Sequence, residues 1–294
     1  MSFFTKVRLR WVDLDVQNHV NNAIIVDYLQ QARIDFLLSG PLAHLVNDGA
    51  AVVGHQVEFV RPVLFDTEPV EVQVQVRSAE TAAFCLHFLL RQHGEICAKA
   101  NTSIAVCDVP TWKPQPLTAS ESAWLEAQVV PLEPFREVGG WEVGTAAFAA
   151  DFVFRWSDLD THSHVSDIRI LDAMSETRVA MNPADSTIHR MQHAADLGYV
   201  WMVARQDVDY LAPVPHQLKP YQVRVGFAKL GRTSLTLVAV LEDKIENIPA
   251  GDVGKVYARC TTVLVCGDRN ARPIPLPEDM RLGLKRWPAV PTSD

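Results

Sequence analysis

Apolar positions along the chain predict the same order of elements twice. The clearest strand is in residues 70–76, where every second residue is valine, the period of a half-buried strand. Residues 21–38 and 167–181 are apolar on several sides at helical spacing, so each is expected to be a helix wrapped by other elements. Four strands are predicted after each helix, at 55–63, 68–77, 83–92 and 95–107, and again at 205–214, 221–227, 233–242 and 254–266.

A repeated motif stands immediately before each predicted helix. The chain reads "RWVDLDVQNHVNN" from Arg10 to Asn22 and "RWSDLDTHSHVSD" from Arg155 to Asp167. Alternating residues lead into both motifs, and they predict a half-buried strand that runs up to Trp11 and to Trp156. The motif is therefore a turn between a strand and a helix, and the chain is a tandem repeat.

Strand, helix and four strands in each half predict an α+β fold in which an antiparallel sheet curls around a long central helix. We expect an N-terminal domain at 1–115, a short helix ("ASESAWLEAQ") and linker within 116–145, and a C-terminal domain at 146–294. The longest extra piece of the second half falls near 182–198. The two sheets are expected to pair edge to edge as an internal pseudo-dimer, because pairing removes exposed edges.

Composition narrows the class of protein. The net charge is −8 over 294 residues without blocks of like charge, so a nucleic-acid partner is not expected. The N-terminus lacks a secretory signal and no apolar run is long enough to cross a membrane, so no membrane association is expected. The five cysteines include no C-x-x-C pair, which indicates reduced thiols in a cytoplasmic protein.

The polar groups of the first turn suit acyl-transfer chemistry. The N–H groups in the first turn of a helix lack intrahelical partners, and the helix dipole favours negative charge there, so Asn21 and Asn22 mark a place where an oxyanion is stabilised. Asp15 could face the carbonyl carbon as nucleophile or as base for a water, and His19 could orient either. Helix capping is the competing role for every Asp and Asn of the turn, and it is the preferred one for Asp13 and Asp158.

Other chemistries have less support. His162 and His164 form an H-x-H pair that could ligate a metal if it lay on a strand, but the first half has Gln17 in place of His162, so no metal is expected. The chain has no G-x-S-x-G elbow, no G-x-G-x-x-G fingerprint and no Walker loop. An α/β-hydrolase, a nicotinamide enzyme and a nucleotide hydrolase are therefore not expected, and no cofactor is predicted.

The repeated motif, with "DYLQQAR" on the first helix, resembles the hot-dog-fold thioesterases of the 4-hydroxybenzoyl-CoA thioesterase-like group. Both halves match, so the chain resembles a tandem, or double, hot-dog protein. The resemblance implies an acyl-CoA thioesterase without metal or organic cofactor, and it places the catalytic carboxylate at Asp15 and Asp160. It also places the oxyanion-binding backbone N–H at Asn22 and Asp167, and implies that such chains often assemble into dimers or trimers.

The second motif departs from the first. It keeps Asp160 and His164, but Ser166 and Asp167 replace the two asparagines, and Ala173 replaces Tyr28 on the helix. A carboxylate beside a developing oxyanion opposes the build-up of charge. We therefore expect the first turn to be the better catalyst.

Substrate contacts are less defined by the sequence. Tyr28 is a candidate for lining an acyl tunnel, with Phe59, Phe84 and Phe88 as further candidates that could equally be plain core. Arg61 and Arg232 are the first candidates for holding the phosphates of CoA, followed by Lys99, Arg205, Lys229 and Arg259. Surface solvation is the competing explanation for each of these cations.

Three other functions remain open. The substrate could be an acyl group carried on acyl carrier protein, although two acidic proteins gain nothing from net charge. A hot-dog dehydratase or hydratase would carry a different Asp–His spacing with an intervening Asn-Pro. A non-catalytic acyl-CoA-binding protein has no evident need for a carboxylate at the turn. The acyl group itself cannot be read from the sequence.

Overall fold

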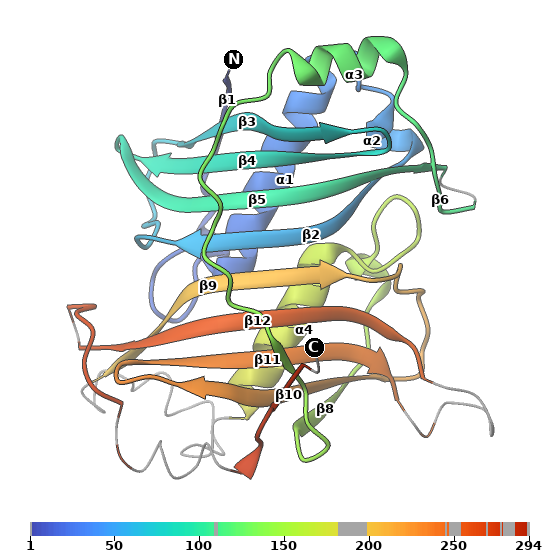
Figure 1. Ribbon diagram of the computed structural model, residues 1–294. Helices are drawn as coiled ribbons and strands as arrows, with labels where there is room; N and C mark the ends of the chain where they lie inside the picture. Colours follow the sequence, from blue (N-terminus) through green and yellow to red (C-terminus); the bar gives the residue numbers. More distant parts are fainter. Residues whose placement is uncertain are drawn as a thin grey trace. The chain divides into compact units, whose positions relative to one another are not determined.

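The computed structural model of the chain describes residues 2–108, 111–181, 199–244, 246, 254–268, 270–276, 278 and 286–292. The chain divides into two compact units, Met1–Arg136 and Glu137–Asp294, called unit 1 and unit 2. The extra piece predicted near 182–198 lies outside the described residues. Each unit is an antiparallel sheet against one long helix, as the sequence predicts (Figure 1).

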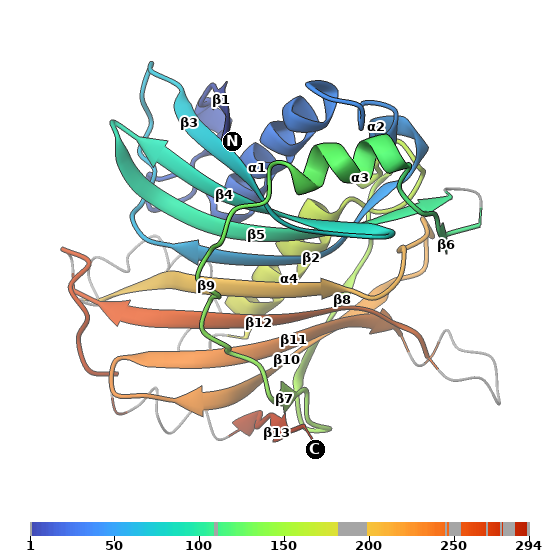
Figure 2. The same cartoon turned by 45° about the horizontal axis from the view of Figure 1, so that its top comes forward.

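Unit 1 contains a five-stranded sheet in the order β1-β3-β4-β5-β2. Figure 2 shows its strands curling around the central helix α1, which packs on β1, β3 and β4. The elements are β1 (Phe3–Val7), α1 (Asn22–Leu38), α2 (Leu45–Asp48), β2 (Ala50–Phe59), β3 (Val70–Glu80), β4 (Ala83–Gln92), β5 (Glu95–Asp108), β6 (Lys113–Pro114) and α3 (Ala119–Glu126). The four valines of β3 are fully buried against α1, as their alternation predicts.

Unit 2 repeats this arrangement with the order β9-β12-β11-β10-β8 and the central helix α4, which packs on β8, β10 and β11. A separate pair of short strands, β7 and β13, also belongs to this unit. The elements are β7 (Trp141–Glu142), β8 (Phe148–Phe152), α4 (Asp167–Ala180), β9 (Val200–Tyr210), β10 (Tyr221–Leu230), β11 (Ser234–Asp243), β12 (Val256–Gly267) and β13 (Val290–Pro291). All eight strands predicted after the two helices are present.

The strand predicted up to the tryptophan of each motif ends four residues earlier, at Val7 and at Phe152. In the first motif the backbone N–H of Arg10 donates to the carboxylate three residues later at 2.8 Å, so it is not available to a neighbouring strand. The chain turns instead into a short 3-10 helix, η1 (Trp11–Asp13), and the second motif does the same in η2 (Trp156–Asp158). The two tryptophan side chains, at which the predicted strands were to end, are 71% and 77% exposed.

The ladders of the two sheets have the same register. Phe3 of β1 lies opposite Val74 of β3, and Phe148 of β8 lies opposite Val225 of β10, its counterpart. The match continues through the next strand pairs of each sheet. A residue on these strands therefore has a defined counterpart in the other unit, which allows the two to be compared position by position.

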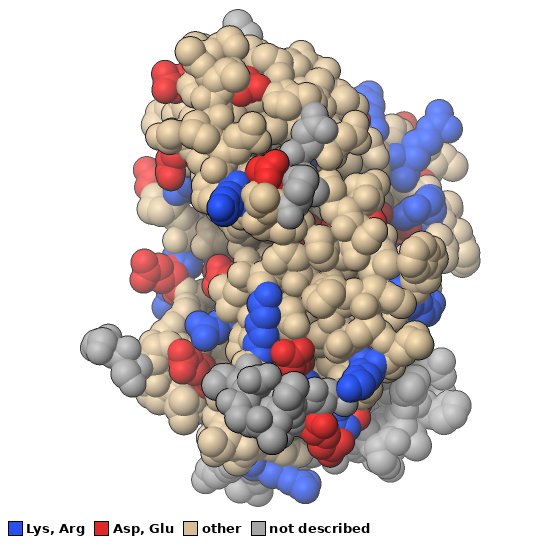
Figure 3. Space-filling view, turned by 90° about the vertical axis from the view of Figure 1, so that its right-hand side faces the viewer, with Lys and Arg blue, Asp and Glu red and all other residues tan. Residues whose placement is uncertain are grey.

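None of the described helices is both long and apolar enough to span a membrane. On the face shown in Figure 3, the described Lys and Arg side chains are interspersed with Asp and Glu and form no continuous basic patch.

Candidate active site at the first turn

Backbone hydrogen bonds fold residues 10–22, the first turn, into a compact hairpin that ends at α1. The N–H of Asp15 donates to the carbonyl of His19 at 2.9 Å, and Leu14 and Val20 form an antiparallel bridge. Asn18 adopts a left-handed conformation with φ of 61°, which asparagine tolerates better than most residues. The hairpin therefore holds Asp15 and the start of α1 in one small structure.

Asp13 is the structural carboxylate of the turn. It is 1% exposed and accepts hydrogen bonds from the backbone and side chain of Arg10 and from the hydroxyl of Tyr28, the last at 2.6 Å. Burial alone would raise the pKa of Asp13, but the hydrogen bonds from Arg10 and Tyr28 together lower it below its usual value. The geometry agrees with the capping role that the sequence favours for this residue.

Asp15 is placed differently, because its carboxylate is only partly engaged. One oxygen accepts from the backbone N–H of Gln17 at 2.8 Å, and the other lies 3.5 Å from Nδ1 of His19. The side chains of Asp15 and His19 are 21% and 28% exposed, so water and a ligand can reach both. The structure therefore brings together the carboxylate and the imidazole that the motif predicts as partners.

The N-terminus of α1 follows directly. Asn21 is the N-cap, and its side-chain oxygen accepts from the N–H of Ala23 at 2.9 Å, while its own N–H donates to the carbonyl of Asp13. The N–H of Asn22, the first helical residue, has no hydrogen-bond acceptor among the described residues. A donor at the positive end of a helix dipole, beside Asp15 in the same hairpin, is suited to bind a carbonyl oxygen.

In residues 155–167, the second turn, backbone N–H groups engage the carboxylates more completely than in the first turn. Asp160 accepts from the backbone N–H groups of His162 and His164, at 2.8 and 3.0 Å. At the start of α4 the carboxylate of Asp167 accepts from the N–H of Ile168 at 2.9 Å, which is a capping contact. Negative charge therefore already occupies the helix N-terminus in unit 2, whereas unit 1 has a neutral asparagine there.

The segment after β2 completes the surroundings of the first turn. The N–H of Val20 donates to the carbonyl of Val63 at 2.8 Å, and His19 forms a bridge with Leu64. The ring of Phe65 packs edge-on against Trp11 with 5.3 Å between centroids. An apolar patch of exposed side chains thus surrounds the turn: Trp11, Val12, Val16, Leu64 and Phe65.

The three residues predicted to bind substrate, Tyr28, Arg61 and Arg232, have different surroundings in the structure. Tyr28 is 2% exposed and its hydroxyl is bonded to Asp13, so it supports the turn from beneath. Arg61 lies on the segment that reaches the turn, but it is exposed and forms an ion pair with Glu95 at 3.0 Å. The start of β10 lies beside the second turn, because Tyr221 donates to the carbonyl of Pro215, which bridges to His164. Arg232 follows the other end of this strand, roughly 30 Å away.

The described part of the chain contains no cluster of three or more His, Cys, Asp or Glu side chains arranged to hold a metal ion. His162 and His164 lie in a tight turn, with Ser163 between them at a φ of 65°, and not on a strand. The premise that they share one face, which the metal hypothesis needed, is therefore not met.

Sequence reasoning missed Leu64 and Phe65, because their contacts with the turn join residues about 45 and 54 positions apart. A signal was available in the aligned "RPV" of the first half and "APV" of the second, each of which precedes the residue that bridges to the turn histidine.

Comparisons with known proteins agree with this geometry. The model of the thioesterase-like superfamily matches residues 9–128 and 154–284, so both units match the same family. A curated relative, the long-chain acyl-CoA thioesterase FadM of Escherichia coli, is 29% identical over 131 residues, which is 42% of this chain and 98% of that protein.

Solved structures show that the tandem arrangement also occurs elsewhere. A protein assigned as an oleoyl thioesterase from Lactobacillus plantarum has a TM-score of 0.71 at 15% identity, covering 94% of this chain and 98% of that chain. The 12:0-ACP thioesterase from Umbellularia californica has a TM-score of 0.66 at 13% identity, covering 90% and 94%. At these identities the likeness concerns the fold, and it confirms the predicted tandem hot-dog architecture.

Proposed function

Because the chain belongs to the thioesterase-like superfamily, we propose that it hydrolyses acyl-CoA thioesters to a free acid and CoA at the first turn. The observation that carries this proposal is the partly engaged carboxylate of Asp15 in the same hairpin as the unpaired N–H of Asn22. A thioester needs a group that delivers the nucleophile and a donor that stabilises the carbonyl oxygen, and these two residues supply both.

In this scheme the thioester oxygen accepts from the Asn22 N–H at the positive end of α1. Asp15 takes a proton from a water held beside His19, and the water oxygen bonds to the carbonyl carbon. The tetrahedral intermediate then breaks its carbon–sulfur bond, and CoA leaves as a thiolate that takes up a proton. A thiol with a pKa of about 8.5 leaves without a general acid, so one carboxylate is enough. Direct attack by Asp15, through an anhydride, would use the same contacts.

The second turn is proposed as the weaker site. Asp160 is held by two backbone N–H groups, and Asp167 puts a carboxylate in the first turn of α4, on the residue whose N–H is the counterpart of the proposed oxyanion donor. A negative charge at this position raises the free energy of an anionic intermediate. The exposed apolar side chains around the first turn are proposed to receive the acyl chain, since apolar patches of this kind mark binding surfaces.

The test is thiol release from a panel of aliphatic and aromatic acyl-CoAs, with wild type, Asp15→Asn and Asp160→Asn compared. We expect Asp15→Asn to lose about 10²-fold or more in kcat, and Asp160→Asn to lose much less. Equal thermal unfolding of the two variants is the control for folding. Loss on Asp160→Asn alone would reverse the ranking of the two turns.

Two further arms test the alternatives. The same acyl groups on acyl carrier protein, compared by kcat/KM, show whether the carrier is CoA or protein. Hydration of enoyl-CoA tests for a dehydratase. Tight binding of acyl-CoA without turnover of any substrate would replace the hydrolase proposal with that of a binding protein.

A further inference from the structure

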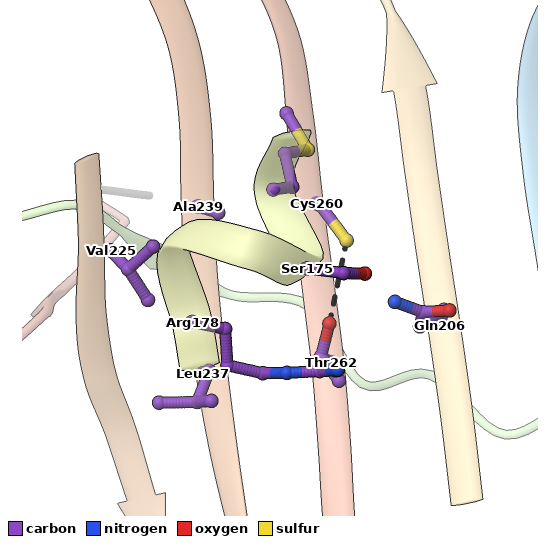
Figure 4. Close-up of a pocket in the computed structure, with 9 residues that line it drawn as sticks. Ser175, Arg178, Gln206, Val225, Leu237, Ala239, Cys260 and Thr262 are labelled. Atoms are coloured by element: carbon purple, nitrogen blue, oxygen red, sulfur yellow. Dashed lines mark hydrogen bonds between the residues drawn. The ribbon is translucent and has the colours of Figure 1, made fainter. Parts of the chain in front are cut away.

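The exposed apolar patch at the first turn depends on a segment outside the helices and strands, residues 60–66, called the flanking segment. Interior space is small by comparison: the cavity of unit 2 in Figure 4, at Ala239, the counterpart of the buried Phe88, has room for about one water molecule. The flanking segment supplies Leu64 and Phe65 to the patch. An irregular segment binds a ligand well only if it is already ordered, so the groups that hold it in place matter.

The side chain of Gln92 holds Leu64 by both of its backbone groups. The N–H of Leu64 donates to Oε1 of Gln92 at 3.0 Å, and Nε2 of Gln92 donates to the carbonyl of Leu64 at 2.7 Å. One amide thus pairs with the donor and the acceptor of a single residue, as a neighbouring strand would. Because Leu64 also bridges to His19, the clamped residue lies between Gln92 and the first turn.

Gln92 is a firm anchor because it ends β4 at a tight hairpin. It pairs with Glu95, and the two residues between them have φ of 51° and 78°, the positive values of a type I′ turn. The same hairpin contacts the flanking segment at two further points. Nε2 of His93 lies 3.0 Å from the carboxylate of Asp66, and Glu95 pairs with Arg61 at 3.0 Å. Exposed pairs of this kind contribute little, so Gln92 is the main anchor.

Unit 2 supports the equivalent position by a different route. Pro215 is the counterpart of Leu64, since each bridges to the histidine of its own turn. Proline has no N–H to donate, and the carbonyl of Pro215 accepts at 2.6 Å from the hydroxyl of Tyr221, a fully buried residue. The two-point clamp by Gln92 therefore belongs to the sequence of unit 1 and not to the fold that both units share.

We propose that Gln92 is a positioning residue that sets the acyl-chain preference of the first turn. It fixes the backbone of Leu64, and with it the patch side chains Leu64 and Phe65, in the conformation that receives the methylene groups beyond the thioester. This inference rests on the proposed function, because it takes the patch as the acyl contact. Without the clamp the flanking segment populates other conformations, and the affinity for a long chain falls with the fraction that stays competent.

The first arm of the test measures binding without turnover, by calorimetry with two CoA thioethers that cannot be hydrolysed, S-ethyl-CoA and S-decyl-CoA. Gln92→Leu removes both hydrogen bonds and keeps a side chain of similar size. It should weaken the binding of S-decyl-CoA about fivefold and leave that of S-ethyl-CoA within about twofold. Gln73→Leu is the matched control, because Gln73 also makes two side-chain hydrogen bonds in the same sheet, but to Ser2 and Arg91. It should bind both thioethers as wild type does.

The second arm observes the flanking segment itself by NMR. The indole N–H signal of Trp11, assigned with Trp11→Phe, reports the ring of Phe65, which packs edge-on against it. Gln92→Leu should move this signal toward its position in Phe65→Ala and speed the exchange of the Leu64 amide, whose acceptor is lost. Gln92→Glu keeps the acceptor and loses the donor, so its results should be intermediate in both arms.

The third arm compares kcat and KM for acetyl-CoA and decanoyl-CoA. The hydrogen bond from Val20 to Val63 still holds the hairpin in Gln92→Leu, so kcat should stay within about threefold while KM for decanoyl-CoA rises about fivefold.

Four results overturn the proposal: no binding of S-decyl-CoA by wild type, unchanged binding of it by Gln92→Leu, an equal loss for both thioethers, or an unmoved Trp11 signal. If binding depends on Gln92 as expected but wild type hydrolyses neither thioester, the hydrolase proposal fails and the positioning role of Gln92 stands.

Discussion

Replacing Tyr28 by phenylalanine tests the role of the buried carboxylate under the first turn. The substitution removes one donor, at 2.6 Å, from Asp13, which is 1% exposed and cannot recover that hydrogen bond from water. Burial, and then the bond to Asp13, raise the pKa of Tyr28, so its hydroxyl is a donor at every ordinary pH. A hydrogen bond to a charged group contributes about 1.5–3 kcal/mol, so Tyr28→Phe should lower the free energy of unfolding by that amount.

The loss should depend on pH in a defined direction. The pKa of Asp13 is lowered from its ordinary 3.8 in the folded state, so its bonds stabilise fully above that pH and are lost as the pH falls through the folded pKa. Removing a donor raises the folded pKa toward 3.8. The difference between Tyr28→Phe and wild type should therefore be greatest at neutral pH and narrow below about pH 3.8.

Urea unfolding followed by fluorescence at several pH values measures both effects. The matched control is Tyr257→Phe, which removes a tyrosine–aspartate bond of 3.0 Å to Asp243, a carboxylate that is less buried. We expect that variant to lose only about 0.5–1.5 kcal/mol. If Tyr28→Phe were as stable as wild type, or if its loss were the same at pH 3 and pH 7, the account of Asp13 as an ionised structural group would be refuted.

Two further outcomes follow from the structure. Trp11→Ala should change the free energy of unfolding by no more than about 0.5 kcal/mol, because the ring is 71% exposed. The same variant should raise KM, and the rise should grow with the length of the acyl chain. A rise that is the same for every length would count against the apolar patch as the acyl contact. All five thiols have raised pKa values through burial, so Ellman's reagent should react slowly at pH 7.5 until urea unfolds the chain, and fast reaction of the native protein would contradict this.

The central helices and the eight strands that follow them could be predicted because their apolar patterns are strong and occur twice. The alternation at 70–76 predicts a half-buried strand, and the apolar residues on several sides of 21–38 predict a wrapped helix; both are found. The extent of the first strand could not be predicted in the same way. The alternating pattern continues to Trp11, but the N–H of Arg10 found an acceptor in Asp13, and an alternating pattern does not reveal which acceptor a backbone donor will choose.

The candidate site shows the same division. Asp15, His19 and Asn22 lie within eight residues, so their proximity was readable from the motif and from the polarity of a helix N-terminus. Tyr28 was predicted as a substrate contact, and in the structure its hydroxyl donates to Asp13. The spacing of these two residues in the sequence does not reveal that contact. Phe65 could not be placed at the turn, because its contact with Trp11 joins residues that are far apart in the sequence.

Duplication within one chain explains how the two units could come to differ. In a symmetric assembly of identical single units, any change would occur in every copy, so replacing a core phenylalanine by alanine would cost about 3–5 kcal/mol in each. Within this chain the cost at Ala239 falls on unit 2 alone, while Phe88 keeps the core of unit 1 filled. The same separation applies to the turns, because Asp167 can cap α4 without placing a carboxylate at Asn22. In the proposed scheme, unit 1 keeps the polar geometry that catalysis needs, and unit 2 was free to change its core packing and to place a carboxylate at the start of its helix.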